Sequence, residues 1–397
     1  MTTRREFLKR STMLSLSPLV PAFLPRSLAA ADPKTDDRVL VVIQLDGGND
    51  GLNMMIPWSD ENYARQRHEL RIAGKEVLKL DERVGLHPQM RGAARLFEDR
   101  RLAVVQGVGY PNPNRSHFES MAIWHHARLD AGQHDGIGWL GRGADVAPRG
   151  DGAADSIYVG SEGVPAALRG RRANAVSFEN EADLQLNSSA AAEPAAGANR
   201  STDVEAFVAR TLASSYAAAR LFSESGEARS GGIDGYPSSM LGQKLKLLAR
   251  LLKLGGGTRL FYVSQSGYDT HAAQLATHAS LLRELSGGLY AFLEDLKGSG
   301  LADRAAVLVF SEFGRRVQEN GSQGTDHGTA APVLLAGAGV QPGLIGTPPD
   351  LNDLDAGDLK MSIDFRRVYA AVLDQWLGIP SAEALGQQFE PLKLFRS

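Results

Sequence analysis

Several places along this 397-residue chain share one pattern, in which an apolar run is followed directly by a polar loop. The polar residues are Asp46; Arg115, Ser116 and His117; Asp269 and His271; and Glu312 with Asp326 and His327. Carboxylates and imidazoles are the ligands that Zn²⁺, Mn²⁺, Mg²⁺ or Ca²⁺ take from a chain without thiolates. The repeated pattern predicts that these side chains converge in one crevice and do metal-assisted chemistry there.

Each of these residues also has a purely structural interpretation. Asp46 could only form a turn, and Ser116 could only cap a helix. Asp269 and His271 could be ordinary loop residues, as could Glu312 with His327. His117 is either a ligand or a general base. Arg115 and Arg315 could hold a substrate anion or lie on the surface. His68, His278 and the pair His125–His126 are expected on solvated faces.

Apolar runs and amphipathic segments alternate along the chain, and they must position these residues. We expect strands at 38–45, 102–108, 258–263 and 305–310, with another before Leu335. We expect helices at 90–100, 116–128, 238–254, 273–297 and 363–377. This alternation predicts an α/β fold with a mostly parallel central sheet and helices on both faces. Ligands of such sheets gather beyond the carboxyl ends of the strands.

The region at about 150–235 differs in character and reads as an inserted cap. It contains a short strand-like piece at 156–159, an Ala/Ser/Glu-rich stretch at 187–201 and a helical pattern at 204–222. We expect one domain over 32–397 with this variable insertion.

The N-terminus carries a twin-arginine motif at Arg4 and Arg5. A moderately apolar stretch and a small-residue cleavage site at 29–31 follow it. Residues 1–31 therefore read as a signal peptide, and the stretch is too short and too rich in proline to be a stable membrane span. We expect the twin-arginine translocase to export the folded chain, which then works in the periplasm or is secreted.

Composition excludes several classes of function. The chain has no cysteine, so disulfides, thiolate metal sites and cysteine nucleophiles are excluded. Its net charge is −3, and the leader is basic, so the mature part is more acidic still; this argues against nucleic acid as a partner. Sequence signatures of serine esterases, zincin proteases, P-loop proteins and dinucleotide-binding proteins are missing. The polar loop that begins at Asp46 is not an EF-hand calcium loop, because Gly48 and Pro57 occupy positions where an EF-hand needs oxygen ligands.

Several motifs together resemble the domain-of-unknown-function family 1501. They are LDGGNDGLN at 45–53, GLHP at 85–88, NRSHF at 114–118, SEFGR at 311–315 and GTDHGTA at 324–330. The family consists largely of twin-arginine-exported bacterial proteins, and it is grouped with the alkaline phosphatase and sulfatase superfamily. The resemblance implies an alkaline phosphatase-like fold that binds one or two metal ions beyond its strands.

The resemblance also implies roles for single residues. Asp46, Asp269, His271 and His327 match metal ligands, and Ser116 matches a nucleophile at a helix N-terminus. The chain departs from the superfamily after 305–310, where Glu312 and Phe313 replace an Asp followed by His or Asn.

We expect a metal-dependent hydrolase of phosphate or sulfate esters, acting on a small anionic substrate. The expected metal ligands are Asp46, Asp269, His271, Glu312, Asp326 and His327, and the expected catalytic residues are Ser116, His117 and Arg115. The alternative is a non-catalytic exported binding or scaffold protein on the same fold.

Overall fold

The central sheet is formed by apolar strands that are covered on both faces. The computed structural model describes residues 38–147, 154–180, 183 and 235–396. The strand β1 (Val39–Asp46) is buried over almost its whole length, as expected for a strand between two helix layers. It lies between two parallel neighbours, β8 (Leu260–Ser266) and β9 (Ala305–Ser311).

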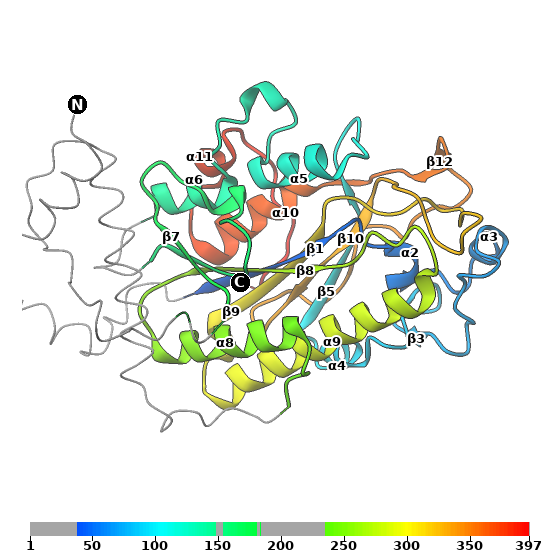
Figure 1. The fold of residues 1–397 in the computed structure, drawn as a ribbon, viewed down its shortest axis with the longest axis horizontal. Coiled ribbons are helices and arrows are strands. Elements are labelled where there is room, and N and C mark those ends of the chain that lie inside the picture. Colours follow the sequence, from blue (N-terminus) through cyan, green and yellow to red (C-terminus); the bar gives the residue numbers. More distant parts are fainter. Residues whose placement is uncertain (1–37, 148–153, 181–182, 184–234, 397) are drawn as a thin grey trace, which may run out of the picture. The chain divides into compact units, whose positions relative to one another are not determined.

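The described strands extend this core into a nine-stranded sheet (Figure 1). The order is β11-β5-β10-β9-β1-β8-β6-β7, and β14 also pairs with β5. The further strands are β5 (Leu102–Gly109), β6 (Ser156–Val159), β7 (Ala175–Phe178), β10 (Ala331–Ala336), β11 (Gly343–Ile345) and β14 (Ile363–Asp364). Only β10 runs antiparallel to its neighbours in this sheet. The predicted mostly parallel sheet is confirmed.

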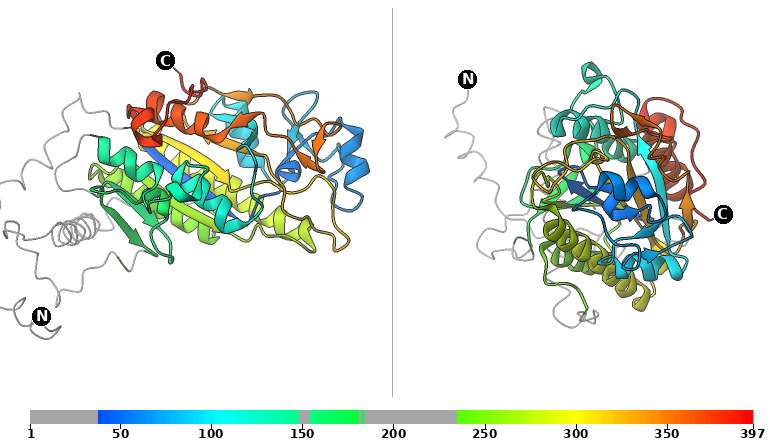
Figure 2. Two further views of the ribbon diagram at one scale, coloured as in Figure 1. Left: turned by 90° about the horizontal axis from the view of Figure 1, so that it is seen from above. Right: turned by 90° about the vertical axis from the view of Figure 1, so that its right-hand side faces the viewer.

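Helices cover both faces of the sheet (Figure 2). One layer contains α4 (Arg91–Glu98), α8 (Met240–Leu254) and α9 (Gln274–Gly298). The other contains α5 (His117–His126), α6 (Trp139–Val146), α10 (Phe365–Ala371) and α11 (Ser381–Leu385). Side chains alternate along a strand, so β1 serves both layers: Val41 and Ile43 pack into the first, and Leu40 and Val42 into the second.

Smaller elements complete the described residues. The segment after β1 forms α2 (Gly51–Met54), α3 (Glu61–Gln66) and a three-stranded sheet of β2 (Met55–Ile56), β4 (Gly85–Leu86) and β3 (Leu78–Lys79). The strands β12 (Leu354–Asp355) and β13 (Asp358–Leu359) form a hairpin. Short 3₁₀ turns are η1 (Ala131–Gln133), η2 (Ala166–Leu168) and η5 (Ala302–Arg304), and η6 (Val372–Leu377) is a π-helix.

Two expectations are refined by the structure. The segment expected as one helix at 363–377 begins as β14, continues as α10 and ends in the π-helical η6. In the region expected as an inserted cap, β6 and β7 add two parallel strands to the sheet. The expected signal peptide and the segments 187–201 and 204–222 lie outside the described residues.

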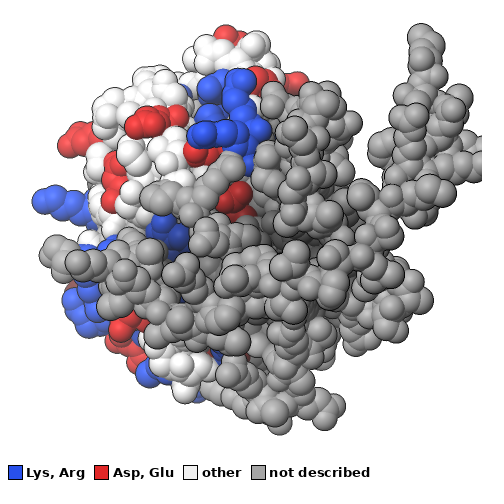
Figure 3. All heavy atoms as spheres, turned by 90° about the vertical axis from the view of Figure 1, so that its left-hand side faces the viewer, with Lys and Arg blue, Asp and Glu red and all other residues white. Residues whose placement is uncertain are grey.

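No helix in the described ranges is long and apolar enough to cross a membrane. Figure 3 shows acidic and basic side chains interspersed on the described part of one face.

Candidate metal centre

The carboxyl ends of β9, β1 and β8 meet at one edge of the sheet. Because these adjacent strands are parallel, the loops that follow them leave on the same side. Asp46 at the end of β1 pairs with Ser266 of β8, and its neighbour Leu45 pairs with Ser311 of β9. The loops after β8 and β9 carry most of the predicted ligands, and the start of α5 reaches the same edge.

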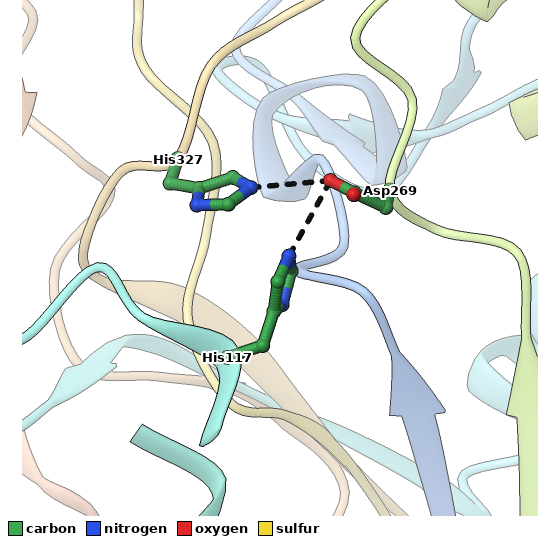
Figure 4. Close-up of side chains that lie close together, drawn as sticks. All are labelled: His117, Asp269 and His327. Atoms are coloured by element: carbon green, nitrogen blue, oxygen red, sulfur yellow. Dashed lines mark hydrogen bonds and ion pairs between the residues drawn. The ribbon is translucent and has the colours of Figure 1, made fainter. Parts of the chain in front are cut away.

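Three imidazole rings converge on one carboxylate oxygen at this edge. Nε2 of His271 lies 3.0 Å from Oδ1 of Asp269, and Nε2 of His327 lies 3.1 Å from the same oxygen. Nε2 of His117 is 3.5 Å away from it. Figure 4 shows His117 and His327 pointing toward Asp269 from separate segments of the chain. One ligand atom each from His117, Asp269 and His327 lies within 4.8 Å of the other two.

The opposite nitrogen of each ring is held by a hydrogen-bond acceptor. The Nδ1 partners are Oε1 of Glu312 at 2.8 Å from His117, the carbonyl oxygen of Arg115 at 2.8 Å from His327, and Oδ1 of Asp326 at 3.2 Å from His271. An acceptor at Nδ1 favours the tautomer that carries its proton there, which leaves the Nε2 lone pair directed at the centre. Metal-ligating histidines are oriented in this way.

The donor set fits a divalent metal ion. Nε2 of His117 is buried and has no hydrogen-bond partner, and such an orphaned polar atom is costly unless a ligand completes it. Imidazole nitrogens with one carboxylate oxygen are the ligand types that Zn²⁺ takes. The hydrogen bond with Glu312 raises the pKa of His117, while burial opposes that rise only in part.

Glu312 and Phe313 contact the histidines of the cluster: Glu312 contacts His117, and Phe313 contacts His117 and His327. Oε1 of Glu312 accepts a hydrogen bond from the Gly47 amide at 3.0 Å, and Oε2 accepts one from the Ser311 hydroxyl at 2.8 Å. The ring of Phe313 packs beside those of His117 and His327, with centroid separations of 4.9 and 5.0 Å. The structure therefore places Glu312 in contact with a candidate ligand, as it does Asp326.

Arg315 is buried and ties the loops of the site together. Its guanidinium donates to the carbonyl oxygens of Gly47, Gly48, Tyr268 and Thr325. It also donates from Nη2 to Oδ1 of Asp269 at 2.6 Å. Burial alone would raise the pKa of Asp269, but the hydrogen bond and the charge of Arg315 outweigh it and lower that pKa to about 2. With its donors engaged in this way, Arg315 is a structural residue rather than an anion site.

Three predicted residues lie beside this cluster. Asp46 accepts hydrogen bonds from Gln44 and, at 3.1 Å, from Ser266. Ser116 is the N-cap of α5, but its side chain makes no capping hydrogen bond. The exposed Arg115 side chain is paired with Asp358.

A cavity of about 440 Å³ opens next to the histidines. Its walls include His117, Asp269 and Glu312 from the cluster, together with Asp46. The remaining lining residues are Gln44, Gly47, Phe118, Met121, Ala122, His125, His126 and Ala166. The cavity thus connects Asp46 with the candidate metal centre.

The expectation that His278 is a surface residue is wrong. Its side chain is 2% exposed, and Nε2 lies 2.9 Å from Oδ1 of Asn49. His126 is also buried, and its Nδ1 lies 2.9 Å from the carbonyl oxygen of Ile137. Both helices were expected to turn these histidines to solvent, but each histidine has a polar partner in the interior. The helical pattern holds no signal of such a partner.

A second polar network was missed in the sequence. Asp50 is buried and receives hydrogen bonds from Arg67 at 2.6 and 3.1 Å and from Gln274 at 2.5 Å. Arg67 also donates to the carbonyl oxygen of Val317 at 2.5 Å. Asp50 belongs to the motif LDGGNDGLN at 45–53, which also contains Asp46. This motif is the sequence feature that could have indicated a role for Asp50. This network stabilises the loops and does not line the cavity.

Comparisons with known proteins give a family and several distant structural likenesses. The family model described as "Protein of unknown function (DUF1501)" matches residues 37–385. No curated protein matches the chain.

The chain is similar to the solved structure of the lipoteichoic acid synthase LtaP from Listeria monocytogenes, with 10% identity and a TM-score of 0.32. The match covers 79% of this chain and 66% of the LtaP chain, which is just under two thirds of its length. Others are the C-terminal periplasmic domain of EptC from Escherichia coli in complex with Zn (10% identity, TM-score 0.35, 77% and 74% covered) and the sulfatase PsFucS1 from Pseudoalteromonas sp. (10% identity, TM-score 0.41, 91% and 74% covered). Likenesses at these TM-scores are too distant to assign chemistry.

Proposed function

The chain belongs to the DUF1501 family, and for it we propose the function of a metal-dependent hydrolase of phosphate or sulfate esters. The observation that carries this proposal is the convergence of three imidazole Nε2 atoms on Asp269. Each ring is held at Nδ1 by its own acceptor, so the cluster is built to present lone pairs to a cation. A bound divalent metal would polarise the ester and lower the pKa of the attacking hydroxyl or water.

The residues of the chain divide into ligands and supports. His117, His327 and Asp269 would hold the metal, and His271, whose Nε2 lies 3.0 Å from Oδ1 of Asp269, would be a further ligand. This set needs no ligand from Phe313. Glu312 and Asp326 orient His117 and His271, which makes them supports in this proposal.

Ser116 is the proposed nucleophile. It lies at the N-terminus of α5, where backbone N–H groups and the helix dipole favour an anion. Its hydroxyl makes no capping bond, so it is not committed to the helix. Arg115 is adjacent, and it would neutralise charge on the transferred group once it leaves Asp358.

The test is hydrolysis of 4-nitrophenyl phosphate and 4-nitrophenyl sulfate by protein stripped with a chelator and reloaded with Zn²⁺, Mn²⁺ or Ca²⁺. We expect turnover only with metal, and a fall of at least about a hundredfold for His327→Ala. His68→Ala, at an exposed position far from the cluster in sequence, should behave as wild type. Absence of turnover of both esters with all three metals would overturn the proposal.

A non-catalytic binding protein is the second candidate, and one observation favours it. Arg315 already compensates the charge of Asp269 without a metal, at 2.6 Å. If this candidate is right, Ser116→Ala leaves the cellular phenotype of the protein unchanged. If the hydrolase is right, the same substitution abolishes turnover and reproduces the phenotype of a deletion.

A further inference from the structure

We propose that Gln274, the first residue of α9, is a positioning residue that sets the spacing of the metal ligands. The inference rests on the metal centre of the proposed function, but not on hydrolysis. Asp269 and His271 come from the loop after β8, and His327 comes from the loop after β9. Figure 4 shows Asp269 and His327 on separate segments of the chain. A metal ion that binds all of them needs these two loops to be held at a fixed separation.

Each loop turns one threonine into the protein beside its ligands. Thr270 lies between Asp269 and His271, and Thr325 lies two residues before His327. The two threonines are buried, at 5% and 0% exposure, whereas Asp269 and His271 are exposed. The threonines therefore face the interior while the ligands beside them face outward. Because Thr270 is bonded directly to both of its neighbours, a shift of this threonine also shifts the two ligands.

The side-chain amide of Gln274 joins the two threonines. Its oxygen accepts a hydrogen bond from the Thr270 hydroxyl at 3.0 Å and another from the Thr325 hydroxyl at 2.6 Å. Gln274 is fully buried, so water cannot replace these bonds. The main chain adds a second link, since the Thr325 amide donates to the carbonyl oxygen of Thr270 at 3.1 Å. The two loops are therefore tied together beside their ligands.

The orientation of the Gln274 amide is fixed from its other side. Its nitrogen donates to Oδ2 of Asp50 at 2.5 Å. A carboxylate only accepts hydrogen bonds, so the amide oxygen must face the threonines. Arg67 in turn holds Asp50 through hydrogen bonds of 2.6 and 3.1 Å, and it donates to the carbonyl oxygen of Arg316 at 2.9 Å. The buried network of Asp50 and Arg67 thus ends on the two loops that carry the ligands.

The two loops also pack closely against each other at this point. A Cβ added at Gly324 would lie 2.2 Å from the carbonyl carbon of His271. The main-chain amide of Gln274 donates to the carbonyl oxygen of Gln323 at 2.9 Å. At the metal centre, Nε2 of His271 and Nε2 of His327 are 3.0 Å apart. Ligands that are held together before a cation binds lose less entropy on binding than ligands on two independent loops.

The first test separates metal affinity from stability in Thr325→Val and Thr325→Ser. Valine has a similar shape to threonine without the hydroxyl, whereas serine keeps the hydroxyl. We measure the Kd of Zn²⁺ by competition with a chromogenic chelator, and the thermal midpoint of the metal-free protein. Thr325→Val should bind Zn²⁺ about tenfold more weakly, and Thr325→Ser should bind it as the wild type does.

Thr258→Val is the matched control for this test. The Thr258 hydroxyl donates to the carbonyl oxygen of Ala154 at 2.8 Å, and Thr258 precedes β8 whereas the ligands follow it. The control removes the same kind of hydrogen bond away from the metal centre. It should lower the thermal midpoint and leave the Kd of Zn²⁺ unchanged. Weakening of Zn²⁺ binding by the same factor in Thr258→Val and Thr325→Val would overturn the positioning role.

The second test uses Gln274→Met, which removes the acceptor and the donor together at similar side-chain length. The Kd of Zn²⁺ should rise by about tenfold to a hundredfold. Amide hydrogen exchange in both loops of the metal-free protein should become faster, because the loops no longer hold each other. A Kd equal to that of the wild type would overturn the positioning role. If Gln274→Met does not fold, the comparison of Thr325→Val with Thr325→Ser decides.

The wild-type protein distinguishes this inference from the proposed function. If it binds Zn²⁺ and hydrolyses no ester, the hydrolase fails, and the Kd values of the variants still decide the role of Gln274. If it hydrolyses esters and the variants bind Zn²⁺ as tightly as the wild type, only the positioning role fails. A wild type that binds no Zn²⁺ would overturn the positioning role.

Discussion

At the scale of single residues, the candidate metal centre depends on ring orientation more than on the number of histidines. His271 and His327 present their Nε2 atoms to Asp269 at 3.0 and 3.1 Å. Rings that were free to rotate would lose much of their affinity for a cation, because second-shell partners typically contribute 10–100-fold to metal affinity. Glu312 and Asp326 are therefore expected to matter without touching the metal.

Chelation is expected to lower the thermal midpoint of unfolding by a few degrees. A metal that binds only the folded state stabilises it by roughly 3 kcal/mol at a hundredfold excess over its Kd. His327→Ala and His271→Ala should each remove most of this sensitivity in differential scanning calorimetry. His68→Ala is the control, because His68 is exposed. His278→Ala would not serve, because His278 is buried against Asn49 and its loss would itself destabilise the fold. A wild-type midpoint that ignores the chelator would count against the metal centre.

Asp50 gives a prediction for acid pH. Burial would raise its pKa, but the charge and hydrogen bonds of Arg67 prevail and lower that pKa to about 2 from 3.8. Because the folded-state pKa is lowered, the pair stabilises the fold above about pH 4, and this contribution is lost as the pH falls toward 2. We expect about 2 kcal/mol to disappear over this window in urea unfolding of the wild type. Asp50→Asn should be less stable at pH 7, yet should lose less stability over the same pH window. Equal losses in both proteins would show that titration of Asp50 is not the source of the acid sensitivity.

At the scale of elements, the loop after β1 determines how closely the site is packed. Gly48 has a φ of +71°, and a Cβ there would lie 2.2 Å from Cε2 of Phe313. Phe313 in turn packs beside His117 and His327. The loop can approach the cluster this closely only because residue 48 is a glycine.

Gly48→Ala is therefore expected to destabilise the protein by about 3 kcal/mol and to weaken metal binding. Backbone strain at positive φ and overpacking against Phe313 both contribute. Gly136→Ala is the matched control, since Gly136 has a φ of +77° with nothing within 4 Å of the added Cβ. It should cost only about 1 kcal/mol and leave metal affinity unchanged. Equal losses of unfolding free energy for the two variants in urea would show that the Phe313 ring moves aside without cost.

The strands could be predicted from the sequence because each is an apolar run with a polar end. The same pattern predicts that Asp269, His271 and His327 lie at one edge of the sheet, and in the structure both histidines lie within 3.1 Å of Asp269. The direction of a side chain could not be predicted in this way. Asp46 is not one of the three residues grouped as able to hold a metal ion, and its carboxylate accepts hydrogen bonds from Gln44 and from Ser266, which is distant in sequence.

At the scale of the whole molecule, export remains a proposal that rests on Arg4 and Arg5. These residues lie outside the described part of the chain. Changing both to Lys should strand the precursor in the cytoplasm, because the translocase reads the arginine pair. Fractionation of cells that express the tagged precursor measures this. Unimpaired export of the double variant would remove the basis for the twin-arginine route.

The topology also has a consequence for how the molecule comes into being. The central strand β1 is made early, but Asp46 meets Ser266 across a separation of 220 residues, and Leu45 meets Ser311 across 266. The nascent chain therefore cannot close its own core until most of it has left the ribosome. His327 is synthesised later still, so the proposed metal ion could bind its full set of ligands only near the end of synthesis. Translation itself sets the earliest moment at which this site can exist.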